Sequence, residues 1–518
     1  MPWTALNERL LAASAATVGL FLGAGVSAAT AAAAVAFGIV AILTRRAPPD
    51  RLLTVQDRCL MNQDRLVAGA APGSGTMAVV MYFSSANMPS ATSSRAAMQR
   101  TILKHPRFGS VVVETASLED ATWRRLPSVE VDLTRHVVQH AAIPATAQEA
   151  RLNELINTDL PRDVPLWRID LLPAEGTSAS SCVLLRASHA LGDGLRLVGA
   201  AGDFLSFGDG TPATVDLIER MTKNKLSLPP RGPLGLARDL VEAATLDKIR
   251  DEDPTCLHKP GALFPRATPR VNVSASVPLA HVKAIRAAAP PGTTLNDVIL
   301  ACFVGGLRRY AEAVGEPIES EPLVRALCAV SVPRRVHRSK RAPPLPARLL
   351  SCSPTELVRA RGGRQASRPH PQMYNDFLLP SIRLPLGEKT PEARLHAVRR
   401  LMAETKASRS SYIMSRLLTL LSSLGLDALI GQTQLTVFGK HSFIYSNLPG
   451  FTQPVHLFDA RAKVERFAVY FPNLVSQLLF LSYDGQLTCS LSTDAATITQ
   501  PQTLVDCFVV EVAKCARD

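Results

Sequence analysis

The sequence predicts a mixed protein of the α/β or α+β class with two lobes. Short apolar runs alternate with amphipathic helical patterns over residues 55–220, and the same alternation resumes from about residue 271. A proline-punctuated connector at 222–270 separates these parts and indicates a crossover between the lobes. Antiparallel pairing is indicated near the C-terminus, where Asp484-Gly485 forms a favoured two-residue hairpin turn.

Composition allows a large core and shows where the charge lies. Hydrophobic residues make up 47% of the 518 residues and charged residues 19%, which excludes a wholly disordered chain. The net charge is +13, and the segment from Arg334 to Arg368 holds ten Lys or Arg against one acid, Glu356. A basic segment of this kind is not the basic face with interleaved aromatic residues that binds nucleic acid, so we expect no nucleic-acid partner.

The N-terminal region contains a long apolar stretch. Residues 10–44 carry no charge, whereas a membrane-spanning helix needs about 20 apolar residues. Arg45, Arg46 and Arg51 follow it, which favours a cytosolic body after the anchor. The apolar core is too long for a cleaved signal peptide. The sequence therefore predicts a membrane anchor, either one span or a helical hairpin that turns near residues 23–25.

Individual elements follow from local patterns. The sequence predicts strands at 76–85 and 181–190, a helix at 94–106 that stops at Pro106, a helix at 294–315 with Thr294 or Asn296 as its N-cap, and a hairpin at 478–492. The expected organisation is an anchor at 1–50, an N-terminal lobe at 51–225, a crossover linker at 226–270, and a C-terminal lobe at 271–518 with a basic, disordered insertion at 334–370.

The nine cysteines predict neither disulfides nor a metal site. Their number is odd, they are scattered, and no CxxC motif or Cys/His cluster at metal-ligand spacing is present. We expect reduced thiols and no bound metal. Cys182 lies inside an apolar strand pattern, which favours core packing over a role as nucleophile, and Ser188 lacks the Gly-x-Ser-x-Gly elbow.

The stretch SHALGDG at 188–194 combines a strand end, a titratable ring and a flexible turn. A neutral imidazole at His189 would be placed at the rim of a sheet, where it can take a proton from an alcohol. Asp193 either fixes the loop or faces the ring. The alternative is a histidine hydrogen-bonded inside a turn, with Asp193 capping the next helix, and the motif alone leaves both open.

Further motifs follow in a fixed order: VPLWRIDLL at 164–172, TLNDV at 294–298, YNDFLLPSIRLPLGEK from 374, and YSNLPG at 445–450. Together with SHALGDG, this order resembles the wax ester synthase/diacylglycerol acyltransferase family over residues 55–515, less the basic insertion. The resemblance implies a two-lobed fold like the CoA-dependent acyltransferases, chloramphenicol acetyltransferase and the peptide-synthetase condensation domains. With the anchor, the predicted fold class is this fold plus an N-terminal transmembrane segment.

The resemblance also implies a reaction. Acyl-CoA would acylate a long-chain alcohol to give a wax ester, or diacylglycerol to give triacylglycerol, with no cofactor besides acyl-CoA as substrate. His189 matches the general base, Asp193 a structural carboxylate, and Gly194 the glycine that keeps the channel mouth open. Asn296 and Asp297 match the NDV pair, and Asn447 the SNxPG asparagine. Either asparagine would hydrogen-bond the oxyanion or order the cleft.

Expected location and partners follow from the anchor and the resemblance. We expect a membrane protein of the endoplasmic reticulum with cytosolic lobes, with lipid droplets or the plasma membrane as alternatives. The basic insertion would either contact anionic lipid headgroups or be a solvated loop. The leucine-rich stretch at 415–431 favours core packing, with an acyl tunnel or membrane contact as alternatives.

Two positions depart from the family pattern. Ser188 stands where the family has the first of two histidines, and Arg168 stands where it usually has an acid after PLW. Two alternative functions stay open: an acyltransferase of the same fold with another hydroxyl acceptor, and a non-catalytic lipid-binding relative. The oligomeric state is open as well.

Overall fold

The computed structural model describes residues 53, 57, 58, 60, 75–113, 121–176, 180–213, 232–258, 270–331, 375, 377–423, 427–458 and 462–517. The predicted fold class is wrong in one part, because it includes a transmembrane segment. Within those ranges, no helix is both long enough and apolar enough to cross a membrane. The apolar stretch at 10–44 and the basic insertion at 334–370 lie outside the described residues.

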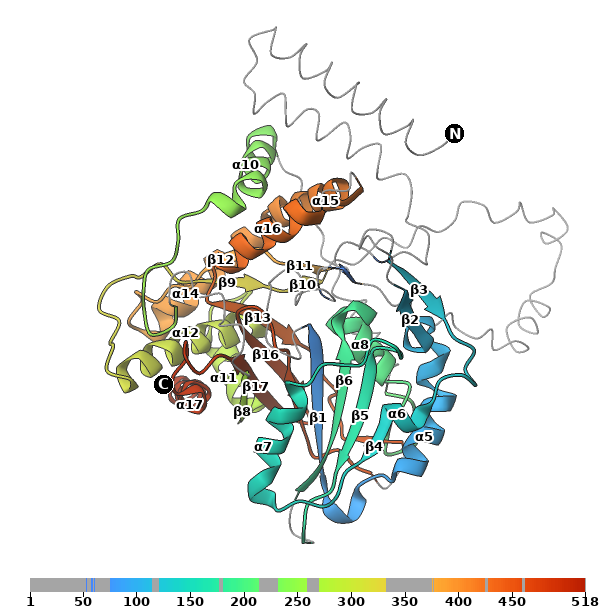
Figure 1. The fold of residues 1–518 in the computed structure, drawn as a ribbon. Helices are drawn as coiled ribbons and strands as arrows, with labels where there is room; N and C mark the ends of the chain where they lie inside the picture. Colours follow the sequence, from blue (N-terminus) through green and yellow to red (C-terminus); the bar gives the residue numbers. More distant parts are fainter. Residues whose placement is uncertain are drawn as a thin grey trace, which may run out of the picture.

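Two sheets form the two lobes, as predicted (Figure 1). The N-terminal lobe holds a five-stranded sheet in the order β15-β1-β6-β5-β4, in which only β4 and β5 pair in parallel. Its strands are β1 (Thr76–Ser84), β4 (Val137–Gln139), β5 (Trp167–Leu172), β6 (Ser180–Ser188) and β15 (Arg466–Tyr470).

Alternation along β6 explains why it lies in the centre of this sheet. Val183 and Ala187 face the main core of the N-terminal lobe, whereas Cys182 and Leu184 face a smaller cluster on the other side, next to helix α7 (Ala145–Ile156). Side chains two residues apart share a face of a strand, so β6 carries apolar residues on both faces. The strand ends at Ser188, immediately before His189.

The C-terminal lobe contains a six-stranded mixed sheet in the order β12-β9-β13-β16-β17-β8. The predicted hairpin is confirmed, with Asp484 and Gly485 at φ values of 43° and 76° between its two strands. Both positive φ values are those of the favoured tight hairpin turn. The strands are β8 (Val271–Pro278), β9 (Arg325–Cys328), β12 (Ser381–Arg383), β13 (Phe443–Leu448), β16 (Ser476–Tyr483) and β17 (Gln486–Thr493).

The lobes exchange strands. β15 comes from the C-terminal part of the chain but pairs with β1 of the N-terminal sheet, placing Val469 opposite Val79. A second crossing pairs β14 (Val455–Leu457) with β7 (Leu205–Phe207). The predicted lobe boundaries at 225 and 271 stay a prediction, and the N-terminal sheet is complete only with a strand from beyond residue 271.

Helices cover the sheets and supply the connections. The predicted helix at 294–315 is observed as α12, and its cap is Thr294, which exchanges capping-box bonds with Asp297. The helix expected at 94–106 ends at Arg100, and Pro106 instead starts a separate 3-10 turn. The other helices are α5 (Ala91–Arg100), α6 (Leu133–His136), α8 (Gly194–Ala201), α10 (Pro233–Ala244), α11 (Leu279–Ala288), α12 (Leu295–Ala313), α14 (Pro391–Ala407), α15 (Ser410–Ser423), α16 (Asp427–Phe438) and α17 (Pro501–Cys515).

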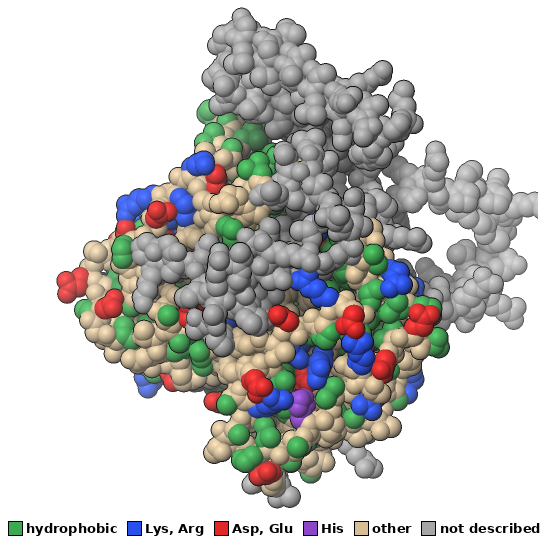
Figure 2. Space-filling view, viewed as in Figure 1, with side chains coloured by type: hydrophobic (Ala, Val, Ile, Leu, Met, Phe, Trp, Pro, Cys, Tyr) green, Lys and Arg blue, Asp and Glu red, His purple; other side chains and the backbone are tan. Residues whose placement is uncertain are grey.

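Short elements complete the fold. These are the strands β2 (Ser110–Val113), β3 (Thr122–Arg125), β10 (Val330–Ser331) and β11 (Phe377–Leu378), and the 3-10 turns Ser85–Asn87, Ile102–Lys104, Pro106–Gly109, His189–Leu191 and Leu246–Lys248. On the face shown in Figure 2, basic and acidic side chains of the described residues are interspersed among neutral ones.

Candidate active site

His189 lies at the rim of the N-terminal sheet, where several distant segments meet. Its backbone N–H donates at 2.9 Å to the carbonyl of Gly75, the residue just before β1. His189 is the first residue of the turn that follows β6. The ring packs against Phe471, with centroids 4.9 Å apart, and against Phe377 at 5.5 Å. Two aromatic side chains from the C-terminal part therefore hold the imidazole on its flanks.

A hydrogen-bonded group lies behind the ring. His189 Nδ1 is 3.0 Å from Oδ1 of Asn375, whose Nδ2 donates to Oδ1 of Asp57 and to the carbonyl oxygen of His189, both at 2.8 Å. Arg107 binds Oδ2 of Asp57 at 3.0 Å and donates to the carbonyl of Ala190 at 2.8 Å. Asn375 and Asp57 are buried. Within the described residues, Nε2 of His189 makes no hydrogen bond.

The environment favours the neutral form of this histidine. Burial lowers the pKa of His189, and the hydrogen bonds to the backbone and to Asn375, with the charge of Asp57, oppose that change only in part. The ring is therefore unprotonated at neutral pH. A neutral imidazole with one nitrogen occupied can accept a proton at the other.

Asp193 and Gly194 lie at the start of α8. Asp193 is the N-cap of this helix, its carboxylate accepting from the N–H of Arg196 at 3.1 Å. A Cβ built on Gly194 would lie 3.4 Å from the Leu448 side chain, so the end of β13 packs against this loop. The two motifs SHALGDG and YSNLPG thus meet in space.

The NDV and SNxPG asparagines bond to each other. Tyr445 donates its hydroxyl to Oδ1 of Asn296 at 2.8 Å, and Nδ2 of Asn447 donates to the same oxygen at 3.2 Å. Asp297 belongs to the capping box of α12. In the described part of the chain, none of these side chains hydrogen-bonds His189. Because Oδ1 of Asn296 accepts both bonds, the hydrogens of its Nδ2 stay available as donors.

The glycine of YSNLPG is required by close packing. A Cβ on Gly450 would lie 1.9 Å from the carbonyl oxygen of Ser482 in β16, so any larger residue would force the strands apart. The chain just after β13 therefore lies close against β16 of the same sheet.

An apolar cavity of about 70 Å³ lies beside the histidine loop. Ala187 of β6 and Leu197 of α8, on either side of His189 in the chain, both contribute to its wall. Cavities lined this way stay dry and accept apolar ligands. Among the described residues, none from the stretch 415–431 lines this cavity. The lining residues are Met77, Val79, Met81, Met98, Ile102, Phe108, Trp167, Leu185, Ala187, Leu197, Val198, Ala201, Phe204, Leu205, Leu448, Gly450, Phe451, Phe467, Val469, Leu481 and Tyr483.

Comparison with known proteins identifies the family. The model "Wax ester synthase/diacylglycerol acyltransferase catalytic domain" matches residues 74–299, and the model "WS/DGAT C-terminal domain" matches residues 375–514. Together they cover more than half of the chain. The chain belongs to the wax ester synthase/diacylglycerol acyltransferase family.

Two curated plant members of this family are similar to the chain at low identity. Wax ester synthase/diacylglycerol acyltransferase 11 of Arabidopsis thaliana is 24% identical over 268 residues, covering 45% of this chain and 52% of that protein. Wax ester synthase/diacylglycerol acyltransferase 6 of the same plant is 30% identical over 113 residues, which cover 20% of this chain and 21% of that protein. The chain therefore aligns with about half the length, or less, of these curated relatives.

Solved structures confirm the two-lobed fold. The wax ester synthase/diacylglycerol acyltransferase from Marinobacter aquaeolei VT8 superposes with a TM-score of 0.55 at 17% identity, covering 90% of this chain and 98% of that one. The starter condensation domain of rhizomide synthetase, in complex with C8-CoA, gives 0.53 at 13% identity, covering 90% and 94%. At these identities the likeness concerns the fold alone.

Both departures from the family pattern have local partners. Ser188 is buried, and its hydroxyl accepts the N–H of Ala190 at 3.3 Å, which closes the turn that carries His189. Arg168 donates its Nε to Oδ1 of Asp170 at 2.9 Å. Each of the two side chains therefore makes a hydrogen bond to a neighbouring residue.

We expect Ser188→His to destabilise the fold by about 1–3 kcal/mol, because a ring must enter a closely packed position and the turn loses its hydroxyl acceptor. The free energy of unfolding in urea measures this. Ser188→Ala, which removes only the hydroxyl, is the control and should cost about 1 kcal/mol. A Ser188→His variant as stable as the wild type would show that the position has room for the family histidine.

Other candidate groups are accounted for. Burial raises the pKa of the Cys182 thiol to about 12, so this side chain is a core residue and no thiolate nucleophile. Among the described residues, no group of His, Cys, Asp and Glu is placed to hold a metal ion.

Sequence reasoning missed the residues behind the ring. Asn375 lies in the stretch YNDFLLPSIRLPLGEK, which marked the family but suggested no role, and Asp57 precedes every motif. Arg107 follows Pro106 in a stretch assigned only to a helix end. No local pattern links these positions, because 318 residues separate Asp57 from Asn375.

Proposed function

We propose that the chain transfers a fatty acyl group from acyl-CoA to the hydroxyl of a long-chain alcohol or of diacylglycerol, with His189 as general base. The observation that carries the proposal is the state of this ring. Its Nδ1 is paired with Asn375, its pKa is lowered by burial, and its Nε2 has no partner among the described residues. This is what a base for an uncharged alcohol requires.

The proposed reaction needs one proton carrier. Nε2 of His189 takes the hydroxyl proton as the alcohol oxygen attacks the thioester carbonyl. The tetrahedral intermediate collapses with cleavage of the carbon–sulfur bond, and the imidazolium returns the proton to the CoA thiolate. The amide hydrogens on Nδ2 of Asn296 are the donors that we assign to the oxyanion.

The cavity beside the loop supports a fatty acyl donor. Its lining is apolar, so a hydrocarbon tail gains the free energy of leaving water when it enters. At about 70 Å³ it is smaller than the roughly 150 Å³ cavity that holds one benzene ring, so a long chain must displace side chains. Met77, Met81 and Met98 line it, and unbranched methionine side chains can move to make room.

The test is acyl transfer by the purified full-length chain. Palmitoyl-CoA is supplied with hexadecanol or with 1,2-dioleoylglycerol, and both thiol release and the ester product are measured. We expect ester formation with at least one acceptor. Turnover should be slower with acetyl-CoA, because its acetyl group lacks the hydrocarbon tail that the cavity would bind. Background turnover with every donor and acceptor, equal to that of His189→Ala, would favour a non-catalytic lipid-binding protein instead.

A further inference from the structure

The amide of Asn375 can take only one orientation in this site. Its nitrogen faces two oxygens that only accept hydrogen bonds, the carboxylate of Asp57 and the carbonyl of His189, each at 2.8 Å. An N–H group must fill that side, so Oδ1 is turned toward the imidazole. An amide oxygen accepts but cannot donate, and Nδ1 of His189, 3.0 Å away, therefore carries the hydrogen.

Asp57 is fixed just as firmly. Its second oxygen binds Arg107 at 3.0 Å, and the same guanidinium reaches the carbonyl of Ala190, the residue after the histidine. The guanidinium also lies over the Trp123 ring, 5.2 Å from its centroid. Asp57 is fully buried and Asn375 is 3% exposed, so little water competes for these bonds. These contacts form a closed circuit, which runs from His189 through Asn375, Asp57 and Arg107 back to the carbonyl of Ala190 in the same loop.

We propose that Asn375 is a positioning residue that holds His189 in the tautomer with hydrogen on Nδ1, and that Asp57 acts through it by fixing the amide orientation. This inference rests on the proposed function, because it matters for activity only if Nε2 is the base. With the hydrogen on Nδ1, the lone pair stays on Nε2, which faces away from Asn375. A rotated amide would offer N–H to Nδ1 and move the hydrogen to Nε2, where it blocks proton acceptance.

Two substitutions of similar size separate positioning from packing. Asn375→Asp keeps an oxygen acceptor toward Nδ1, whereas Asn375→Leu fills the space without one. We expect kcat to fall about 100-fold in Asn375→Leu, within the range of general-base catalysis, with KM little changed. Asn375→Asp loses the N–H groups that face Asp57 and the carbonyl of His189 but keeps the acceptor for Nδ1, so it should retain clearly more activity than Asn375→Leu. A role in packing alone predicts the reverse order, because Leu is apolar and Asp places two carboxyl groups together.

Asp57→Asn is the second arm and leaves position 375 untouched. An amide at 57 can donate as well as accept, so only the carbonyl of His189 still fixes the orientation of Asn375, and the preference for one tautomer is weakened. We expect a smaller fall in kcat, about 10-fold, and little further loss when Asn375→Leu is combined with it, because both act through one path. Additive losses would overturn the role given to Asp57. Thermal unfolding of each variant shows that it is folded.

A direct measurement of His189 does not depend on acyl transfer. Diethyl pyrocarbonate modifies the unprotonated imidazole, and peptide mass spectrometry follows His189 as the pH is varied. Loss of the Asn375 bond, which favours the protonated ring, should move the titration of Asn375→Leu to lower pH than wild type. Asn375→Asp should not move it down. If Asn375→Leu left the titration of His189 unchanged and kcat within twofold of wild type, the inference would be overturned. If the wild type were inactive but the titration of His189 shifted as expected, only the proposed function would be contradicted.

Discussion

His189→Ala is expected to lower kcat for acyl transfer by at least about 100-fold, because general-base catalysis contributes roughly 10² to 10⁴ in rate. The loss should fall on kcat and leave KM nearly unchanged, since in the proposed reaction the ring takes the proton of the acceptor and does not anchor the acyl chain. His281→Ala, an exposed histidine on α11, is the matched control and should behave as wild type.

The pH profile tests the same role without a mutation. Burial lowers the pKa of His189 below its ordinary value near 6.5, so the base form dominates at and above that pH. We expect kcat/KM to be flat above about pH 6.5 on this account and to fall only as the pH drops through the lowered pKa. An acid limb centred above pH 7, or a His189→Ala variant with wild-type kcat, would contradict the assignment.

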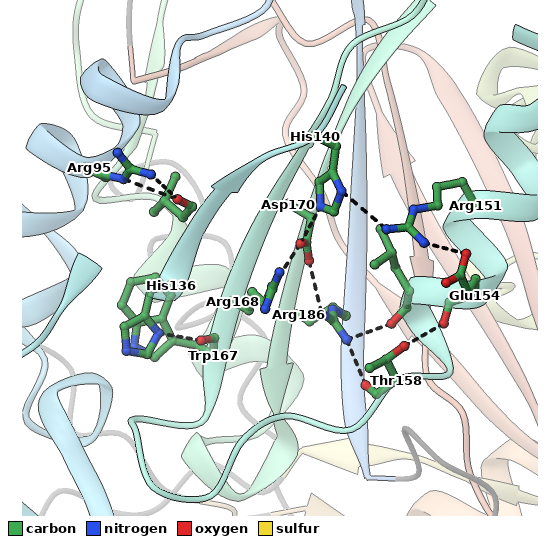
Figure 3. A network of polar contacts seen from close by, with 12 residues as sticks. Arg95, His136, His140, Arg151, Glu154, Thr158, Trp167, Arg168, Asp170 and Arg186 are labelled. Atoms are coloured by element: carbon green, nitrogen blue, oxygen red, sulfur yellow. Dashed lines mark hydrogen bonds and ion pairs between the residues drawn. The ribbon is translucent and has the colours of Figure 1, made fainter. Parts of the chain in front are cut away.

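Asp170→Asn is expected to have the largest effect on stability, about 3–5 kcal/mol, because it breaks a buried ionic network (Figure 3). Oδ2 of Asp170 binds Arg186 at 3.1 Å, and Oδ1 accepts from Arg168 and from Nε2 of His140, both at 2.9 Å. Arg186 is 1% exposed, and without the carboxylate its charge would be left unpaired inside the lobe.

The network also joins the sheet to helix α7. Arg186 donates to the carbonyls of Leu155 and Thr158, at 2.7 and 2.8 Å, where that helix ends. Burial raises the pKa of Asp170, but the charge of Arg186 and the bonds from His140 and Arg168 outweigh it, so the net pKa is lowered. A carboxyl group whose pKa is lowered by folding stabilises the protein at pH values above its pKa in the unfolded chain. This stabilisation is lost as the pH falls through the pKa in the folded protein.

Unfolding in urea at pH 7 and at pH 4 measures both the stability lost in Asp170→Asn and the dependence of that loss on pH. The matched control is Asp163→Asn, which removes an exposed ion pair with Arg135 and should leave the midpoint unchanged. Equal stability of Asp170→Asn and wild type would show that the network is compensated by other contacts. A larger deficit at pH 4 than at pH 7 would contradict the sign of the linkage, because the wild type gains least from this carboxylate at low pH.

The two lobes, the hairpin and the histidine motif were predictable, because each follows from patterns within short stretches of the sequence. Asp484-Gly485 sets its turn through two residues that tolerate positive φ, and His189 follows an apolar strand directly. Thr294 was one of two cap choices, and the capping box with Asp297 decided between them. Strand exchange was not predictable, because β15 differs in no local way from a strand of its own lobe.

The sequence by itself determined that an acyltransferase-like fold carries His189 at the end of a buried strand, since motif order and apolar alternation are local properties. Tertiary structure alone decided which groups surround that ring. Asp57, Arg107 and Asn375 reach it from three segments far apart in the chain, and a hydrogen bond depends on distance and direction in space, which no spacing along the sequence records.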